Sequence, residues 1–169
     1  MSAPELVVDI AALRRSPGTV HRVRGSVVLD GLETTLANVP GGRVAVDLSL
    51  ENTIEGVVAT GRIVAEAQGE CRRCLELVAD ELDLPVRETF EREPTEGETW
   101  PIVDDRVDLE PLIREAVLLA LPLAPLCRDD CLGPEPERFP TRIASVDRVE
   151  SPVPVDPRWS ALDQLRLDE

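Results

Sequence analysis

The sequence predicts an α+β fold, in which an antiparallel β-sheet, or a strongly curved, barrel-like form of it, packs against one main helix. Three observations lead to this prediction. Long stretches of the chain alternate apolar and polar residues with a period of two, which is typical of half-buried strands. One later segment instead carries apolar residues at helical spacing. The 169 residues suffice for one domain and a tail.

The alternating stretches predict four long strands and one short one. Three long strands follow one another with short turns between them, so an antiparallel meander is their simplest arrangement. Gly56 and Gly61 are expected to let the third long strand bend. Residues 93–105 are rich in acids, Gly and Pro and are predicted to form a loop. The predicted strands are an edge strand at 6–8 and long strands at 19–29, 43–51, 54–68 and 75–92.

The main helix is predicted at residues 108–121. Asp108 is a favourable N-cap, Pro111 suits the first turn, and Pro122 cannot continue a helix. The apolar residues of the segment form one stripe, which we expect to pack across the sheet and close the core. This stripe consists of Leu109, Leu112, Ile113, Ala116, Val117, Ala120 and Leu121.

The composition changes after Cys131, which divides the chain into a domain at 1–131 and a proline-rich tail at 132–169. The tail is predicted to end in a short helix that starts at Asp156-Pro157. Such a helix is too short to be stable alone, so it must dock either on its own domain or on a partner. Its apolar face comprises Trp159, Leu162 and Leu165.

The net charge of −15 indicates the kind of partner to expect. An acidic chain is repelled by phosphate backbones at long range, so basic protein partners are favoured over broad nucleic-acid binding. Aromatic residues make up 2 % of the chain, which leaves little material for stacking on bases. Residues 1–28 are the exception, because their positive charges outnumber their acids. They are either solvated side chains or a local contact for RNA, through Arg14, Arg15, His21, Arg22 and Arg24.

No catalytic arrangement is recognisable, so we predict that the protein is not an enzyme and has no small-molecule substrate. His21 is the only histidine, and neither a GxGxxG motif nor a Walker loop is present. The paired acids Asp104-Asp105 and Asp129-Asp130 are expected to be ordinary surface residues. Neither a signal-peptide pattern nor a run of ~18 apolar residues occurs, which predicts a cytoplasmic protein without a membrane contact. Its thiols are then expected to be reduced.

The four cysteines form two pairs, a CxxC at Cys71 and Cys74 and a CxxxC at Cys127 and Cys131. Each pair directs two thiolates to one spot, so the two pairs together match a tetrahedral structural zinc site. Zinc would join a turn between two strands to the end of the main helix and add to stability. Two alternatives stay open: free thiols, including relics of an earlier metal site, and a redox pair.

Two further cations, Arg72 and Arg73, lie inside the CxxC pair. An arginine beside thiolates offsets their negative charge. The alternative is that these side chains are exposed and available for a phosphate or a partner.

Several motifs together resemble the YceD family of large ribosomal RNA subunit accumulation proteins. The resemblance covers residues 5–133 and the terminal helix. Many similar members continue with a further cysteine cluster, whereas residues 133–136 here contain no cysteine. The motifs are Cys71-Arg72-Arg73-Cys74-Leu75, Asp108-Leu109, Leu121-Pro122-Leu123-Ala124-Pro125-Leu126-Cys127, Cys131-Leu132-Gly133 and Asp156-Pro157-Arg158-Trp159 with Leu162.

The resemblance implies a role in accumulation or processing of large-subunit ribosomal RNA. It favours an assembly factor that binds a basic large-subunit ribosomal protein or a pre-ribosomal particle, because an acidic chain complements such partners in charge. Direct contact with ribosomal RNA is the secondary expectation. Two other hypotheses are a zinc-clamped interaction module with a non-ribosomal partner and a thiol redox protein.

Overall fold

Alternating apolar residues build one curled sheet in the computed structural model, which describes residues 4–16, 18–54 and 56–140. The strands lie in the order β1-β8-β7-β6-β5-β4-β2, and β3 pairs with β5 outside this path. All neighbours are antiparallel except β6 and β7, so the predicted curved antiparallel sheet is confirmed with one parallel pair added. The strands are β1 (Val7–Asp9), β2 (Val20–Val28), β3 (Ala37–Asn38), β4 (Arg43–Asn52), β5 (Val57–Glu70), β6 (Leu77–Glu91), β7 (Trp100–Val103) and β8 (Arg106–Asp108).

The predicted meander is formed by β4, β5 and β6, with bounds shifted by a few residues. One alternating set is buried in β4 and β5, as in Val57, Ala59 and Ile63, and in β6 the inward set is half-buried except for the buried Phe90. The opposite set is more exposed and carries most of the polar residues, which confirms the assignment of inner and outer faces. Gly61 lies where β5 passes close to β4, because a Cβ there would come within 2.1 Å of the Asp47 carbonyl oxygen. Only glycine fits this approach.

The prediction of a continuous loop at residues 93–105 is wrong, because this segment contains β7 and the turn into β8. Asp104 and Asp105 both have positive φ, 49° and 55°, the conformation of a two-residue hairpin turn that Asp tolerates. Phe90 pairs with Trp100 across the parallel β6–β7 contact, and their ring centroids lie 6.4 Å apart. The sequence pattern does not reveal β7 and β8, because both strands are short and Pro101 interrupts the alternation of β7.

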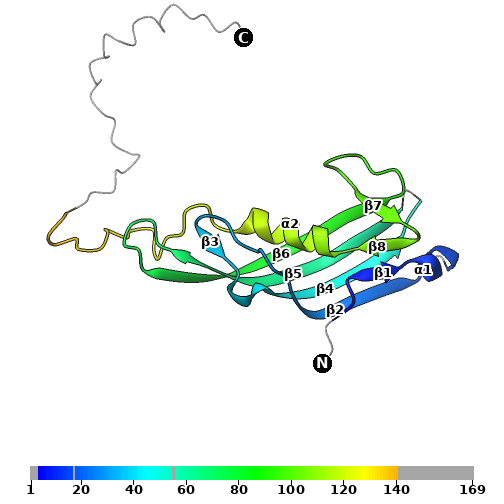
Figure 1. Cartoon of the computed structure of the whole chain (residues 1–169), viewed down its shortest axis with the longest axis horizontal. Coiled ribbons are helices and arrows are strands. Elements are labelled where there is room, and N and C mark those ends of the chain that lie inside the picture. Colours follow the sequence, from blue (N-terminus) through cyan, green and yellow to red (C-terminus); the bar gives the residue numbers. More distant parts are fainter. Residues whose placement is uncertain (1–3, 17, 55, 141–169) are drawn as a thin grey trace, which may run out of the picture.

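The main helix is α2 (Glu110–Ala120), as predicted, and Figure 1 shows it lying along the long strands β5 and β6. Its N-cap is Leu109, whereas the predicted cap Asp108 still accepts a hydrogen bond of 3.0 Å from the Glu110 N–H. The stripe residues Leu112, Ile113 and Val117 are buried against the sheet. Two short helical segments complete the fold, α1 (Ala11–Arg15) and η1 (Pro40–Gly42).

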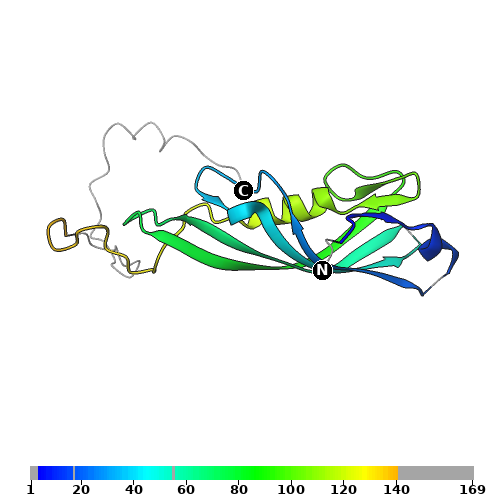
Figure 2. The ribbon, with the colours of Figure 1, turned by 60° about the horizontal axis from the view of Figure 1, so that its bottom comes forward.

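The sheet curls around α2, so one face is covered and the opposite, outer face stays open to solvent (Figure 2). The covered face holds a continuous apolar core, in which Phe90 is the largest fully buried side chain. The predicted tail helix at Asp156-Pro157 lies outside the described residues. No helix of the described part of the chain is both long and apolar enough to cross a membrane.

Candidate metal centre

The first cysteine pair lies in the β5–β6 turn (residues 71–76), at the end of the longest hairpin. The turn is closed by two backbone hydrogen bonds, from the Cys71 N–H to the Glu76 carbonyl at 2.8 Å and from the Leu75 N–H to the Cys71 carbonyl at 2.9 Å. Leu75 adopts a positive φ of 63°, which is uncommon for a leucine. This tight backbone brings the thiols of Cys71 and Cys74 to the same side of the turn.

The second pair is brought to the same place by the segment that follows α2. Pro122 ends the helix, and the chain then continues toward the β5–β6 turn (Figure 1). The Arg72 N–H donates a hydrogen bond of 2.9 Å to the Pro125 carbonyl oxygen, which fixes the two segments side by side. Cys131 follows a turn in which its N–H donates to the Arg128 carbonyl at 3.1 Å.

The four sulfurs form one compact cluster. All of the sulfur atoms of Cys71, Cys74, Cys127 and Cys131 lie within 4.8 Å of one another. Cys71 and Cys131 are 3.9 Å apart, and Cys74 and Cys127 are 3.6 Å apart. Zn–S bonds of about 2.3 Å in a tetrahedron require sulfurs about 3.8 Å apart, so these distances fit zinc. They are far longer than a disulfide bond of about 2.05 Å.

The electrostatics of the cluster differ from one sulfur to the next. Backbone N–H groups of Cys74 and Cys127 donate to the Cys71 sulfur and lower the pKa of its thiol to about 6. The Glu76 N–H lowers the pKa of Cys74, but burial and the three neighbouring sulfurs outweigh it and raise that pKa to about 12. Burial likewise raises the pKa of Cys127. One sulfur is thus ready to be a thiolate, while a bound cation would have to displace protons from others.

The arrangement gives little support to a redox pair. The CxxC lies in a turn between two strands, whereas redox motifs of this kind open a helix. Cys71, whose pKa is lowered, is fully buried, so a substrate disulfide has no direct access to it. The short sulfur contacts also join a cysteine of one pair to a cysteine of the other. The cluster can therefore hold a metal ion more readily than it can exchange disulfides.

The two arginines of the turn lie in different surroundings. Arg73 donates from Nη1 to the carbonyl oxygens of Asp129 and Cys131, at 2.9 and 2.8 Å, and so fastens the second pair to the first. Arg72 is exposed, and only its backbone makes a described hydrogen bond. Arg73 therefore contributes to the architecture of the cluster, while Arg72 remains available to a partner.

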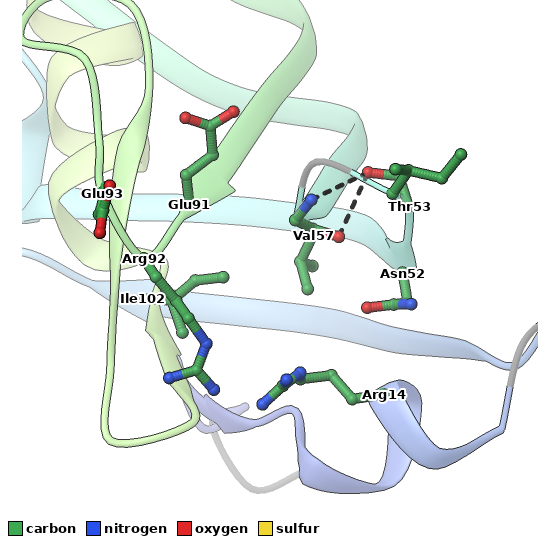
Figure 3. Close-up of a pocket in the computed structure, with 10 residues that line it drawn as sticks. Arg14, Asn52, Thr53, Val57, Glu91, Arg92, Glu93 and Ile102 are labelled. Atoms are coloured by element: carbon green, nitrogen blue, oxygen red, sulfur yellow. Dashed lines mark hydrogen bonds between the residues drawn. The ribbon is translucent and has the colours of Figure 1, made fainter.

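The predicted N-terminal contact residues do not come together on one surface. Arg14 of α1 lines a pocket of about 600 Å³, where Figure 3 shows its side chain approaching that of Arg92. Both guanidinium groups bind the same Asp105 oxygen, and the Arg14 contact measures 2.5 Å. Arg15 is exposed elsewhere on α1. Arg92 and Asp105 are absent from the predicted set because no local sequence pattern links positions so far apart.

The remaining predicted residues lie on the edge strand β2. Arg22 and Arg24 belong to its outer set, and Arg24 forms an ion pair of 3.3 Å with Asp47 of β4. His21 belongs to the alternate set, which includes the buried Val23, and is itself exposed. The two β2 arginines thus lie on the outer face of the sheet, whereas Arg14 lines the pocket and binds Asp105.

A curled, mixed β-sheet with one main helix and a four-cysteine cluster at the end of its longest hairpin defines this as a small β-rich protein with a candidate metal centre. The chain belongs to the YceD family, described as Large ribosomal RNA subunit accumulation protein YceD, whose sequence pattern matches residues 59–166. The match includes the long hairpin, α2 and both cysteine pairs, and it bears out the resemblance read from the motifs.

Several mycobacterial proteins are similar to this chain. An uncharacterized protein of Mycobacterium tuberculosis is 35 % identical over 174 residues, which cover 96 % of this chain and 82 % of the relative. An uncharacterized protein of Mycobacterium bovis is similar to the same extent. A third, from Mycobacterium leprae, is 32 % identical over 138 residues, covering 76 % of this chain and 63 % of the relative. No solved structure matches this chain.

Proposed function

We propose that this protein is a non-enzymatic ribosome-assembly factor of the cytoplasm, which supports accumulation or processing of the 23S ribosomal RNA of the large subunit. The observation that carries the proposal is the family match over residues 59–166, since the description of that family names large ribosomal RNA subunit accumulation. The protein would act by binding a basic large-subunit ribosomal protein or a precursor particle.

Charge supports this kind of partner. The net charge of −15 attracts the basic surfaces of ribosomal proteins and raises the rate of encounter with them. Binding of this origin weakens as salt rises, because surface charges are screened beyond about 8 Å at physiological ionic strength. A salt-sensitive association with large-subunit precursors is therefore expected.

We assign the four-cysteine cluster a structural role in this function. Its residues Cys71, Cys74, Cys127 and Cys131 would hold one zinc ion, and the fit of the sulfur distances supports that assignment. The ion supplies no reaction there; it joins the β5–β6 turn to the segment after α2. It would add to the hydrogen bonds that Arg72 and Arg73 already make between the two segments, and so form one rigid end of the molecule.

Sedimentation of cell lysates through sucrose gradients tests the proposal. At low salt the protein is expected to travel with large-subunit precursors, and at high salt to shift to the top of the gradient. Loss of the gene is expected to lower mature 23S RNA relative to 16S RNA.

Two results would contradict the proposal. One is a protein found only at the top of the gradient, even at low salt and in cells enriched in precursors. The other is a stable complex with a non-ribosomal protein, which would favour a zinc-clamped interaction module instead.

A further inference from the structure

Four arginines on the outer face of the sheet lie in two adjacent cross-strand rows, although they come from three different strands. The register of β2, β4, β5 and β6 places Arg22, Ser49, Thr60 and Arg87 in the first row. The second row consists of Arg24, Asp47, Arg62 and Pro85. We call these eight residues the arginine rows.

The two rows differ in how their charges are balanced. In the second row Arg24 pairs with Asp47 at 3.3 Å, and Arg62 pairs with Asp83 of the following row at 2.8 Å. The first row contains no acid. No ion pair among the described residues involves its exposed arginines, Arg22 and Arg87. This row therefore presents two uncompensated guanidinium groups.

Hydroxyl groups fill the space between these two cations. Ser49 and Thr60 are partly exposed, and no described hydrogen bond uses either side-chain oxygen. The row is thus a sequence of guanidinium, hydroxyl, hydroxyl and guanidinium across four strands, spaced at about 4.8 Å per strand. Arginine and hydroxyl side chains are the usual donors to phosphate oxygens of nucleic-acid backbones.

The composition of the arginine rows also indicates which part of a nucleic acid they can contact. Neither row contains an aromatic side chain, so bases have no ring on which to stack. The rows lie on the convex side of a curled sheet, which cannot enclose a splayed base (Figure 2). Contacts limited to phosphates and sugars are expected of such a surface, as in the recognition of RNA helices by shape.

The acidic character of the whole chain does not prevent a local contact. Unpaired acids of the same face lie outside the two rows. Glu51 is one row beyond Arg22, and Glu66 and Glu81 are two rows beyond Arg24, toward the β5–β6 turn. At physiological salt, charges further than about 8 Å from a phosphate are largely screened. Glu66 and Glu81 lie beyond this range, so the arginine rows determine the interaction at contact distance.

We propose that the arginine rows bind the phosphate backbone of RNA, with Arg22 and Arg87 as the principal contacts. The identification of the anion as RNA rests on the proposed function, whereas the location of the site rests on the sheet register. The surface differs from the N-terminal set predicted from sequence, because Arg14 is bound to Asp105 and Arg62 and Arg87 join from β5 and β6. Binding at this face is independent of base sequence.

Fluorescence anisotropy with a labelled RNA hairpin, measured over a series of salt concentrations, tests this inference on the full chain. The Arg22→Gln, Arg87→Gln double variant is expected to bind the hairpin about tenfold more weakly or worse at low salt. The slope of log K against log salt should become shallower by roughly two, one for each lost phosphate contact. An Arg15→Gln, Arg43→Gln variant has the same net charge, and both of its exposed side chains lie outside the arginine rows. This control should bind as the wild type does.

The outcomes separate this inference from the proposed function. Equal binding by wild type and the Arg22, Arg87 variant, or no binding of the hairpin by the wild type, would overturn the inference. If the variant left precursor particles while still binding the hairpin, the face would belong to a ribosomal protein and the inference would again be wrong. The proposed function fails instead if the wild type never associates with precursor particles. Circular dichroism and the melting temperature confirm that each variant is folded.

Discussion

The guanidinium group of Arg73 donates a hydrogen bond of 2.8 Å to the carbonyl oxygen of Cys131, and a second of 2.9 Å to that of Asp129. The first cysteine pair thus holds the backbone of the second through an arginine that the CxxC motif itself contains. These hydrogen bonds do not depend on a bound ion, and they help to position Cys131 beside the first cysteine pair.

Replacing Arg73 by Gln is expected to lower the free energy of unfolding by about 1–2 kcal/mol, because two hydrogen bonds from a charged donor are lost at a partly exposed site. Urea denaturation measures this change. Arg72→Gln is the matched control, since the Arg72 side chain makes no described contact, and it should stay within about 0.5 kcal/mol of the wild type. Equal effects of the two substitutions would show that the Arg73 contacts contribute nothing.

Elemental mass spectrometry of protein purified without an affinity tag is expected to find about one zinc per chain. In the Cys71→Ser, Cys74→Ser variant the zinc should be absent and the melting temperature lower, because the clamp between the two segments is lost. A strong chelator should lower the melting temperature of the wild type but not that of the variant. Zinc-free wild-type protein with four thiols that titrate freely would make the cysteines relics.

Gly42→Ala is expected to be far more destabilising than Gly41→Ala, although the two glycines are neighbours with similar positive φ values of 62° and 65°. A Cβ on Gly42 would lie 2.1 Å from the Leu29 carbonyl oxygen, whereas a Cβ on Gly41 meets nothing within 4 Å. Gly41→Ala should therefore cost only the backbone strain of about 1–2 kcal/mol. Gly42→Ala adds a clash with the backbone, and thermal denaturation should show a clearly larger loss.

Asp105→Asn tests the carboxylate that Arg14 and Arg92 share at the pocket of Figure 3. Asn tolerates the left-handed backbone of this turn, so the substitution removes the charge without adding strain. The three side chains are 43–55 % exposed, and such pairs are weak, so we expect a loss of about 1 kcal/mol. Asp104→Asn, at the adjacent turn position without a described ion pair, should be neutral. High salt should reduce the difference between the two variants.

Local patterns were sufficient to predict the long strands and α2, because each is long enough for its period to be recognised. The same holds for the cysteine pairs, whose spacing within each pair is a local property. The β7–β8 hairpin was missed, since β7 has four residues and one of them is Pro101. Its parallel pairing with β6 depends on the contact of Phe90 with Trp100, which no local pattern encodes.

The arginine rows illustrate a second limit of prediction from sequence. Arg22 and Arg87 are 65 positions apart in the chain and become members of one row only through the registers of three strand pairs. A shift of one residue in any pair would place one of them on the opposite face. The N-terminal basic residues, in contrast, are close in sequence, yet the fold gives Arg14 and Arg22 different surroundings: Arg14 binds Asp105, whereas Arg22 belongs to the outer set of β2.

The length of the β5–β6 hairpin has a consequence for how one chain engages a large particle. Thr60 and Cys71 are eleven positions apart, with ten residues of β5 between them, which at about 3.3 Å per residue corresponds to at most roughly 35 Å. The hairpin therefore holds two regions of different chemistry at a fixed separation. Cationic side chains lie near its middle, and cysteines lie at its tip. If both regions contacted one ribonucleoprotein surface, two weak contacts held at a constant separation would reinforce each other through effective concentration, without a large interface.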